Sequence, residues 1–164
     1  MVQNIKEVPY GVSDFQTMVE QNIYYVDKTM YIPELEKQAR YLIFIRPRRF
    51  GKSIFLGMLH AYYDIRTKHK FQQWFGNLWI GKHPTPLQGR YQVMHLDFSQ
   101  VGGNIDNLEE KFNFYMGVQL DGFVRDYAEF YSDELRRKVN ATQDAGGKLA
   151  LIQSEAKVKE YPLY

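Results

Sequence analysis

The sequence RPRRFGKS, residues 46–53, decides the fold expected for this chain. An apolar run at residues 41–45 precedes it, and residues 54–65 follow it with apolar side chains at helical spacing. A strand, a basic loop ending in Gly-Lys-Ser and a helix, in that order, form the context that a phosphate-binding loop requires. The first position departs from the usual pattern, because Arg46 replaces glycine and Pro47 follows it. The stretch therefore predicts a variant phosphate-binding loop.

The residue types in this loop predict how it would bind a nucleotide. Backbone N–H groups and the N-terminus of the following helix attract phosphate, and Gly51 lets the backbone come close to it. Lys52 would contact the outer phosphates, and the Ser53 hydroxyl would ligate Mg²⁺. Because Pro47 lacks an N–H, the donors would come from Phe50 onward. The loop arginines would neutralise phosphate, or else face solvent or a partner. The predicted nucleotide-binding residues are Arg46, Arg48, Arg49, Phe50, Gly51, Lys52, Ser53 and Ile54.

Composition limits the class of protein. The chain has 164 residues, 45% hydrophobic and 24% charged, which suits a single globular domain over 1–164. Its net charge of +2 is no general nucleic-acid signature, although residues 40–52 carry five basic side chains and no acidic one. The absence of cysteine excludes disulfides and cysteine-ligated metals and fits a reducing compartment. Without a signal peptide at residues 1–10 or a long apolar run, we expect a cytoplasmic protein and no membrane partner.

The order of patterns along the chain predicts the fold class. Residues 1–40 are expected to form lead-in helices, residues 41–66 a strand, the loop and a helix, and residues 91–164 a second strand and further helices. Strands at 41–45 and 91–98, joined through a helix, predict an α/β fold with a P-loop NTPase-like parallel sheet flanked by helices. Two strands are too few for such a sheet. We therefore expect it to be incomplete and helix-rich, with the chain an N-terminal portion of a longer domain.

The acid that a P-loop enzyme uses to organise Mg²⁺ and water is hard to place in this sequence. Asp97 is the strand-end carboxylate available, and it is a weak catalytic candidate, because His95 interrupts the apolar run before it. An aspartate that caps a turn explains the same position equally well. No catalytic residue is assigned on this basis.

Four segments together resemble the AAA-ATPase-like proteins, in which a P-loop NTPase domain is usually followed by a PD-(D/E)XK nuclease-like domain. The basic loop is the most specific of them, and in that family an arginine commonly replaces its first glycine. Asp27 and Lys28 match a motif of unassigned role, for which a structural ion pair is expected. The segments are residues 10–15, 25–29, 44–53 and 96–99.

The resemblance implies an ATPase with ATP and Mg²⁺ as cofactors. The family's acidic strand typically follows a Pro-Leu-Tyr-like start, which this sequence matches at residues 162–164. The resemblance thus implies that the acidic motif lies beyond Tyr164 and that residues 1–164 alone have no ATPase activity. It also implies a possible nucleic-acid partner through the nuclease-like domain.

Three functions compete for the loop at residues 46–53. The first is ATP binding through a variant Walker A loop, with hydrolysis confined to a complete protein. The second is a degenerate loop that binds no nucleotide and serves as an interaction or scaffold module, as Arg46 and Pro47 suggest. The third is nucleic-acid binding by the basic cluster at residues 46–52, which would be sensitive to salt and insensitive to ATP.

Overall fold

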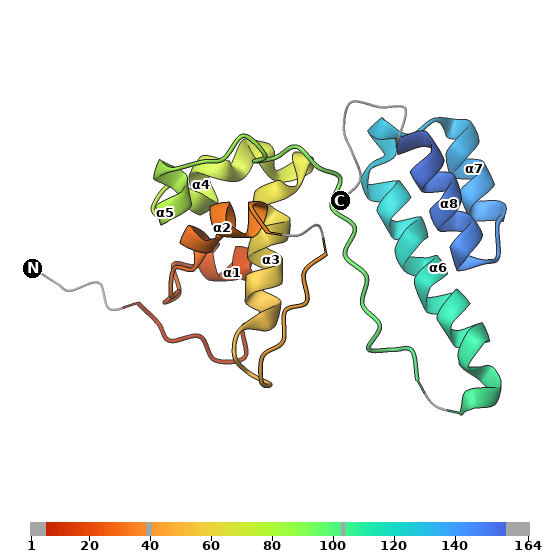
Figure 1. The fold of residues 1–164 in the computed structure, drawn as a ribbon, viewed down its shortest axis with the longest axis horizontal. Coiled ribbons are helices and arrows are strands. Elements are labelled where there is room, and N and C mark those ends of the chain that lie inside the picture. The colour runs from red at the N-terminus through yellow and green to blue at the C-terminus, as the bar shows by residue number, and fades with distance from the viewer. Residues whose placement is uncertain (1–5, 39–40, 103, 157–164) are drawn as a thin grey trace, which may run out of the picture. The chain divides into compact units, whose positions relative to one another are not determined.

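The structure, a computed structural model, describes residues 6–38, 41–102 and 104–156. Its regular elements within these ranges are all helices. The chain divides into two compact units, residues 1–90 and residues 91–164. Figure 1 shows α1 to α5 in the first unit and α6 to α8 in the second.

The first unit packs short helices against the longer helix α3. Phe55, Met58 and Tyr62 of α3 recur at steps of three and four, so they share one face of the helix and are buried together. Phe15 and Phe75 stack in the same core with ring centroids 5.1 Å apart. The elements of this unit are α1 (Phe15–Glu20), η1 (Thr29–Tyr31), α2 (Ile32–Glu36), α3 (Lys52–Tyr63), η2 (Ile65–Lys70), α4 (Phe71–Phe75) and α5 (Trp79–Lys82).

The aromatic residues after α3 attach the following segment to this core. Trp74 and Phe75 are both buried, and the Trp74 indole donates a hydrogen bond to the Glu20 carboxylate at 2.9 Å. Four aromatic residues in an otherwise irregular stretch, Phe71, Trp74, Phe75 and Trp79, predict that the segment is fixed to the core, and this is confirmed for Trp74 and Phe75. The segment is more regular than its glycines and prolines indicate, because η2, α4 and α5 all form within it.

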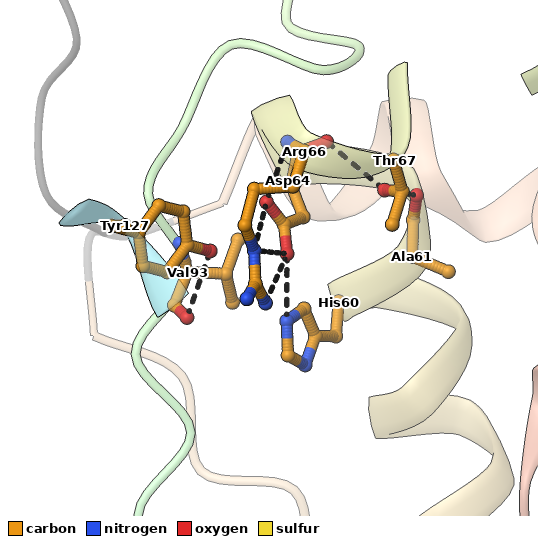
Figure 2. Close-up of polar contacts among 7 residues, drawn as sticks. All are labelled: His60, Ala61, Asp64, Arg66, Thr67, Val93 and Tyr127. Atoms are coloured by element: carbon orange, nitrogen blue, oxygen red, sulfur yellow. Dashed lines mark hydrogen bonds and ion pairs between the residues drawn. The ribbon is translucent and has the colours of Figure 1, made fainter. Parts of the chain in front are cut away.

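Within residues 91–102 and 104–156, the second unit consists of three α-helices and two 3₁₀ turns. Apolar residues at steps of three and four predict one long helix over residues 105–130, which is present as α6 with a 3₁₀ turn at each end. Lys148, which is buried, pairs with Asp121 at 2.5 Å and so connects α8 to α6. The Tyr127 hydroxyl accepts a hydrogen bond from the Val93 N–H at 2.9 Å (Figure 2). The elements are η3 (Ile105–Asn107), α6 (Leu108–Asp126), η4 (Ala128–Phe130), α7 (Asp133–Ala141) and α8 (Ala145–Ala156).

The α/β fold with a parallel sheet is wrong for the residues that the structure describes. Residues 41–45 are irregular, and their side chains are between 41% and 88% exposed instead of buried on both faces. Residues 91–98 likewise form no strand element. An extended segment needs neighbouring strands to accept and donate its backbone hydrogen bonds, and two strands alone do not make a stable sheet. The apolar pattern therefore predicts two strands, but the described residues contain no sheet in which these segments could pair.

Candidate functional site

The predicted loop precedes α3 directly and turns through two residues with left-handed backbone conformations. Arg49 has φ 67° and Gly51 has φ 74°. Gly51 is the N-cap of α3, and its carbonyl accepts the Phe55 N–H at 3.0 Å, the first hydrogen bond of the helix. A residue with a side chain is strained at this φ, whereas glycine is not. The loop thus leads directly into α3. The first N–H groups of this helix have no acceptor within the helix and face outward from its N-terminal end.

The Lys52 side chain folds back over the loop that precedes it. Its ammonium donates hydrogen bonds to the carbonyls of Arg46 at 2.6 Å and Pro47 at 2.9 Å. Both acceptors are neutral carbonyls at the beginning of the loop, so the charge of Lys52 is held within the curve of the loop without a carboxylate partner. This is the position from which a lysine at a helix N-terminus can reach a phosphate group bound at the loop.

The arginines and Phe50 lie on the outside of this loop. Arg46, Arg48, Arg49 and Phe50 are all exposed. The Arg46 guanidinium lies 5.3 Å from the centre of the Phe44 ring, which in turn stacks on Phe55. Arg46 is therefore attached to the core of the first unit through two aromatic rings, whereas the structure gives no such contact for Arg48 or Arg49.

The two residues after Lys52 point in different directions. The Ser53 side chain is exposed in the first turn of α3, where its hydroxyl is accessible to a metal ion. Ile54 packs against the apolar core of the first unit. Ile54 can therefore contribute its backbone N–H to a ligand, but its side chain has a packing role.

Asp27 and Lys28 do not form the ion pair that was expected. One Asp27 carboxylate oxygen accepts hydrogen bonds from the Thr29 N–H at 2.8 Å and the Thr29 hydroxyl at 2.7 Å. The other oxygen accepts the Trp79 N–H at 2.7 Å. Asp27 thus has a structural role through hydrogen bonds, while the Lys28 ammonium lies elsewhere, 3.6 Å from the point where a Cβ on Gly51 would be.

Asp97, the weak catalytic candidate, lies in a turn of the second unit. Its carboxylate accepts the Ser99 N–H at 2.8 Å, and its own N–H donates to the Gln119 side chain at 2.6 Å. Hydrogen bonds from the Ser99 N–H, which has the larger effect, and from the Ser99 hydroxyl hold the pKa of Asp97 below its usual value. This geometry is that of an aspartate that caps a turn.

We expect Asp97→Ala to leave nucleotide binding unchanged within about twofold, because an exposed turn residue contributes little beyond its own surroundings. Ser53→Ala, which removes the predicted metal ligand, is expected to weaken the Mg²⁺-dependent part of the affinity. Titration of both variants with a nucleotide at several Mg²⁺ concentrations measures this difference. Loss of Mg²⁺ dependence in Asp97→Ala would instead make Asp97 the metal-organising acid.

A polar cluster at the other end of α3 was not identified from the sequence. The buried carboxylate of Asp64 accepts hydrogen bonds from the Arg66 N–H at 2.8 Å, the Arg66 guanidinium at 2.9 Å and the His60 ring at 3.1 Å (Figure 2). The Thr67 hydroxyl donates to the Ala61 carbonyl at 2.9 Å. Burial raises the pKa of Asp64, but the hydrogen bonds from His60 and Arg66 outweigh it, so the pKa lies below its usual value. The cluster joins α3 to η2.

Residues 6–38, 41–102 and 104–156 contain no group of three or more histidine, aspartate and glutamate side chains arranged to hold a metal ion. None of the helices described there is both long and apolar enough to cross a membrane.

Two comparisons with known proteins found matches to this chain, one to a relative and one to a family model. A protein from Azotobacter chroococcum mcd 1, described as an uncharacterized protein in the vnfD 5' region, is 44% identical over 55 residues. The aligned part is 33% of this chain and 11% of that relative, so the chain spans only a small share of the relative's length. No solved structure matches the chain. The family model AAA-ATPase_like, described as "Predicted AAA-ATPase", matches residues 9–161. Because this match covers nearly the whole sequence, the chain belongs to the AAA-ATPase-like family.

Proposed function

We propose that this chain binds ATP with Mg²⁺ through residues 46–54. The observation that carries the proposal is the position of Lys52, whose ammonium lies over the loop at the N-terminus of α3 and donates to two neutral carbonyls. A phosphate oxygen is a stronger acceptor for an ammonium than a carbonyl is, since the hydrogen bond is then charged on both sides. Membership of a family described as a predicted AAA-ATPase supports the nucleotide as the source of that phosphate.

The other residues of the loop fit a nucleotide phosphate. Gly51 brings the backbone close without a side chain, and the first turn of α3 supplies N–H groups and the positive end of the helix dipole. Ser53 would hold the metal, and the metal would neutralise charge on the phosphate oxygens. The exposed arginines add positive potential around the loop, which attracts an anion before it binds. We infer binding without turnover for residues 1–164, because Asp97, the candidate acid in this sequence, is engaged in a turn with Ser99.

A titration with a fluorescent ATP analogue, with and without Mg²⁺, tests the proposal. We expect saturable binding that unlabelled ATP and ADP displace and that AMP displaces weakly, because the loop recognises the outer phosphates. Absence of saturable binding would favour the scaffold function. A parallel titration with a short DNA duplex distinguishes the third function, since salt-sensitive DNA binding that ATP does not displace would indicate a nucleic-acid site.

A further inference from the structure

Both sequence neighbours of Lys28, Asp27 and Thr29, accept hydrogen bonds from the N-terminal turn of α5. On one side, the Asp27 carboxylate accepts the Trp79 N–H at 2.7 Å. On the other side, the buried hydroxyl of Thr29 accepts the Ile80 N–H at 3.1 Å. Both donors belong to the first turn of α5. The backbone at Lys28 is therefore fixed on either side, and this limits the positions that its side chain can reach.

From this position the Lys28 side chain reaches the predicted phosphate loop. Its ammonium would lie 3.6 Å from a Cβ built on Gly51, so it occupies the side of Gly51 where any other residue would carry its side chain. The approach joins residues 23 positions apart in the sequence, one before α2 and one at the start of α3. A Cβ at Gly51 would thus be in ordinary van der Waals contact with Lys28, and it is the left-handed φ of 74° that favours glycine at this position.

The charges around the loop favour an anion. Among the described residues, the Lys28 ammonium makes no hydrogen bond or ion pair, although the side chain is half-buried. Lys52, the next residue after Gly51, donates to the carbonyls of Arg46 and Pro47 and to no carboxylate of the described residues. The carboxylate nearest in sequence, Asp27, is already engaged with Thr29 and Trp79. The Lys28 ammonium therefore approaches the loop at Gly51, and neither it nor Lys52 pairs with a carboxylate within the described residues.

We propose that Lys28 is a second ammonium ligand for the nucleotide phosphates bound at Gly51 and Lys52. This inference rests on the proposed function of the loop, and it assigns a role to the Asp27-Lys28 pair of residues. Asp27 and Thr29 position the backbone on α5, and Lys28 places its charge at the loop. A backbone that is fixed in advance favours binding, because less conformational entropy is lost when the lysine contacts phosphate.

Substitution of Lys28 by glutamine tests the assignment, since it removes the charge and keeps most of the side chain. Loss of a charge-assisted hydrogen bond to phosphate is expected to weaken ATP binding about tenfold to a hundredfold. Lys28→Arg should restore most of this affinity. Lys82→Gln is the matched control, because Lys82 is an exposed lysine at the end of α5. Thermal unfolding without nucleotide should be the same for all variants, as the Lys28 ammonium has no partner to lose.

A second experiment uses the unsubstituted chain, so its result does not depend on how the variants fold. Lysine acetylation by an amine-reactive reagent, read by mass spectrometry, should be slowed at Lys28 and Lys52 by ATP and unchanged at Lys82. Equal ATP affinity in Lys28→Gln and Lys82→Gln, with no protection of Lys28, would overturn the assignment while leaving the loop's function intact. Failure of the unsubstituted chain to bind ATP would overturn both the proposed function and this inference.

Discussion

Replacement of Lys52 by alanine is expected to abolish measurable binding of Mg-ATP to this chain. The ammonium lies within the curve of the loop, and each charge-assisted hydrogen bond to phosphate contributes about 1.5–3 kcal/mol. Two such bonds correspond to a loss of affinity of at least about a hundredfold. The measurement is a titration of the variant with a fluorescent ATP analogue, followed by competition with unlabelled ATP.

The control for this prediction separates binding from folding. In the free protein Lys52 contacts only exposed carbonyls, so its removal should change the free energy of unfolding by less than about 1 kcal/mol. Lys37→Ala serves as a matched variant, because Lys37 is an exposed lysine of the same unit that pairs with Glu34 on the surface. An unchanged ATP affinity in Lys52→Ala would mean that the loop is not the nucleotide site.

Replacement of Asp64 by alanine is expected to lower the free energy of unfolding by about 2–3 kcal/mol. The carboxylate is buried and accepts hydrogen bonds from Arg66 and His60, so its loss removes an acceptor from both side chains (Figure 2). The Arg66 and His60 side chains are 30% and 26% exposed, so water can solvate part of each, which places the cost toward the lower end for a broken buried pair. Urea unfolding monitored by circular dichroism measures the difference.

Glu34→Ala is the matched control for Asp64, since Glu34 forms an exposed ion pair with Lys37 in the same unit. A surface pair of this kind contributes only about 0–1 kcal/mol. If Asp64→Ala and Glu34→Ala are equally stable, the cluster at the end of α3 does not hold α3 to η2.

The depressed pKa of Asp64 also sets the sign of its pH dependence. The pKa of Asp64 is lower in the folded protein than in the unfolded chain, where it is about 4. The ionised carboxylate therefore contributes fully to the free energy of unfolding when the pH is above about 4. This stabilisation is lost as the pH falls through the lower pKa that Asp64 has in the folded protein. The stability difference between the unsubstituted chain and Asp64→Asn should therefore shrink as the pH is lowered below about 4. A difference that stays constant with pH would contradict this account.

The helices of the second unit were predictable because their signals are local. Ser132 caps α7 by accepting the Leu135 N–H at 3.2 Å, as its position before Asp133 indicates. The long helix is marked by apolar residues at steps of three and four. Gly146 and Gly147 predict a break between two helices, yet they lie inside the first turn of α8, where the Gly147 N–H donates to the Asp144 carboxylate at 2.5 Å.

Whether residues 41–45 and 91–98 form strands was not predictable in the same way, because a strand depends on partner segments that can lie far along the sequence. The apolar run at 41–45 has the composition of a buried strand, but no other segment of the described residues pairs with it. The Asp64 cluster was missed although a signal was present, since His60 and Asp64 are four residues apart on one helical face. The contact between Lys28 and Gly51 had no sequence signal, because it depends on how α5 holds residues 27–29.

The family was recognisable because its information is contained in short motifs, whereas the nucleotide-binding role of the loop stays a prediction. The prediction of an AAA-ATPase-like protein is confirmed by the match over residues 9–161. The position of Gly51 at the cap of α3 follows from the Gly-Lys-Ser triplet, since glycine alone takes a left-handed φ without strain. The roles of Arg48 and Arg49 stay predictions.

The exposed run at residues 41–45 has a consequence for how the chain behaves in concentrated solution. Five consecutive uncharged residues, YLIFI, combine high β-propensity with exposed apolar side chains, which is typical of segments that assemble into cross-β stacks. In the sequence, Arg40 and Arg46 flank this run. Like charges brought into register by stacking repel one another, so we expect these two arginines to oppose self-assembly. This expected effect of Arg46 on solubility is independent of any ligand at the loop.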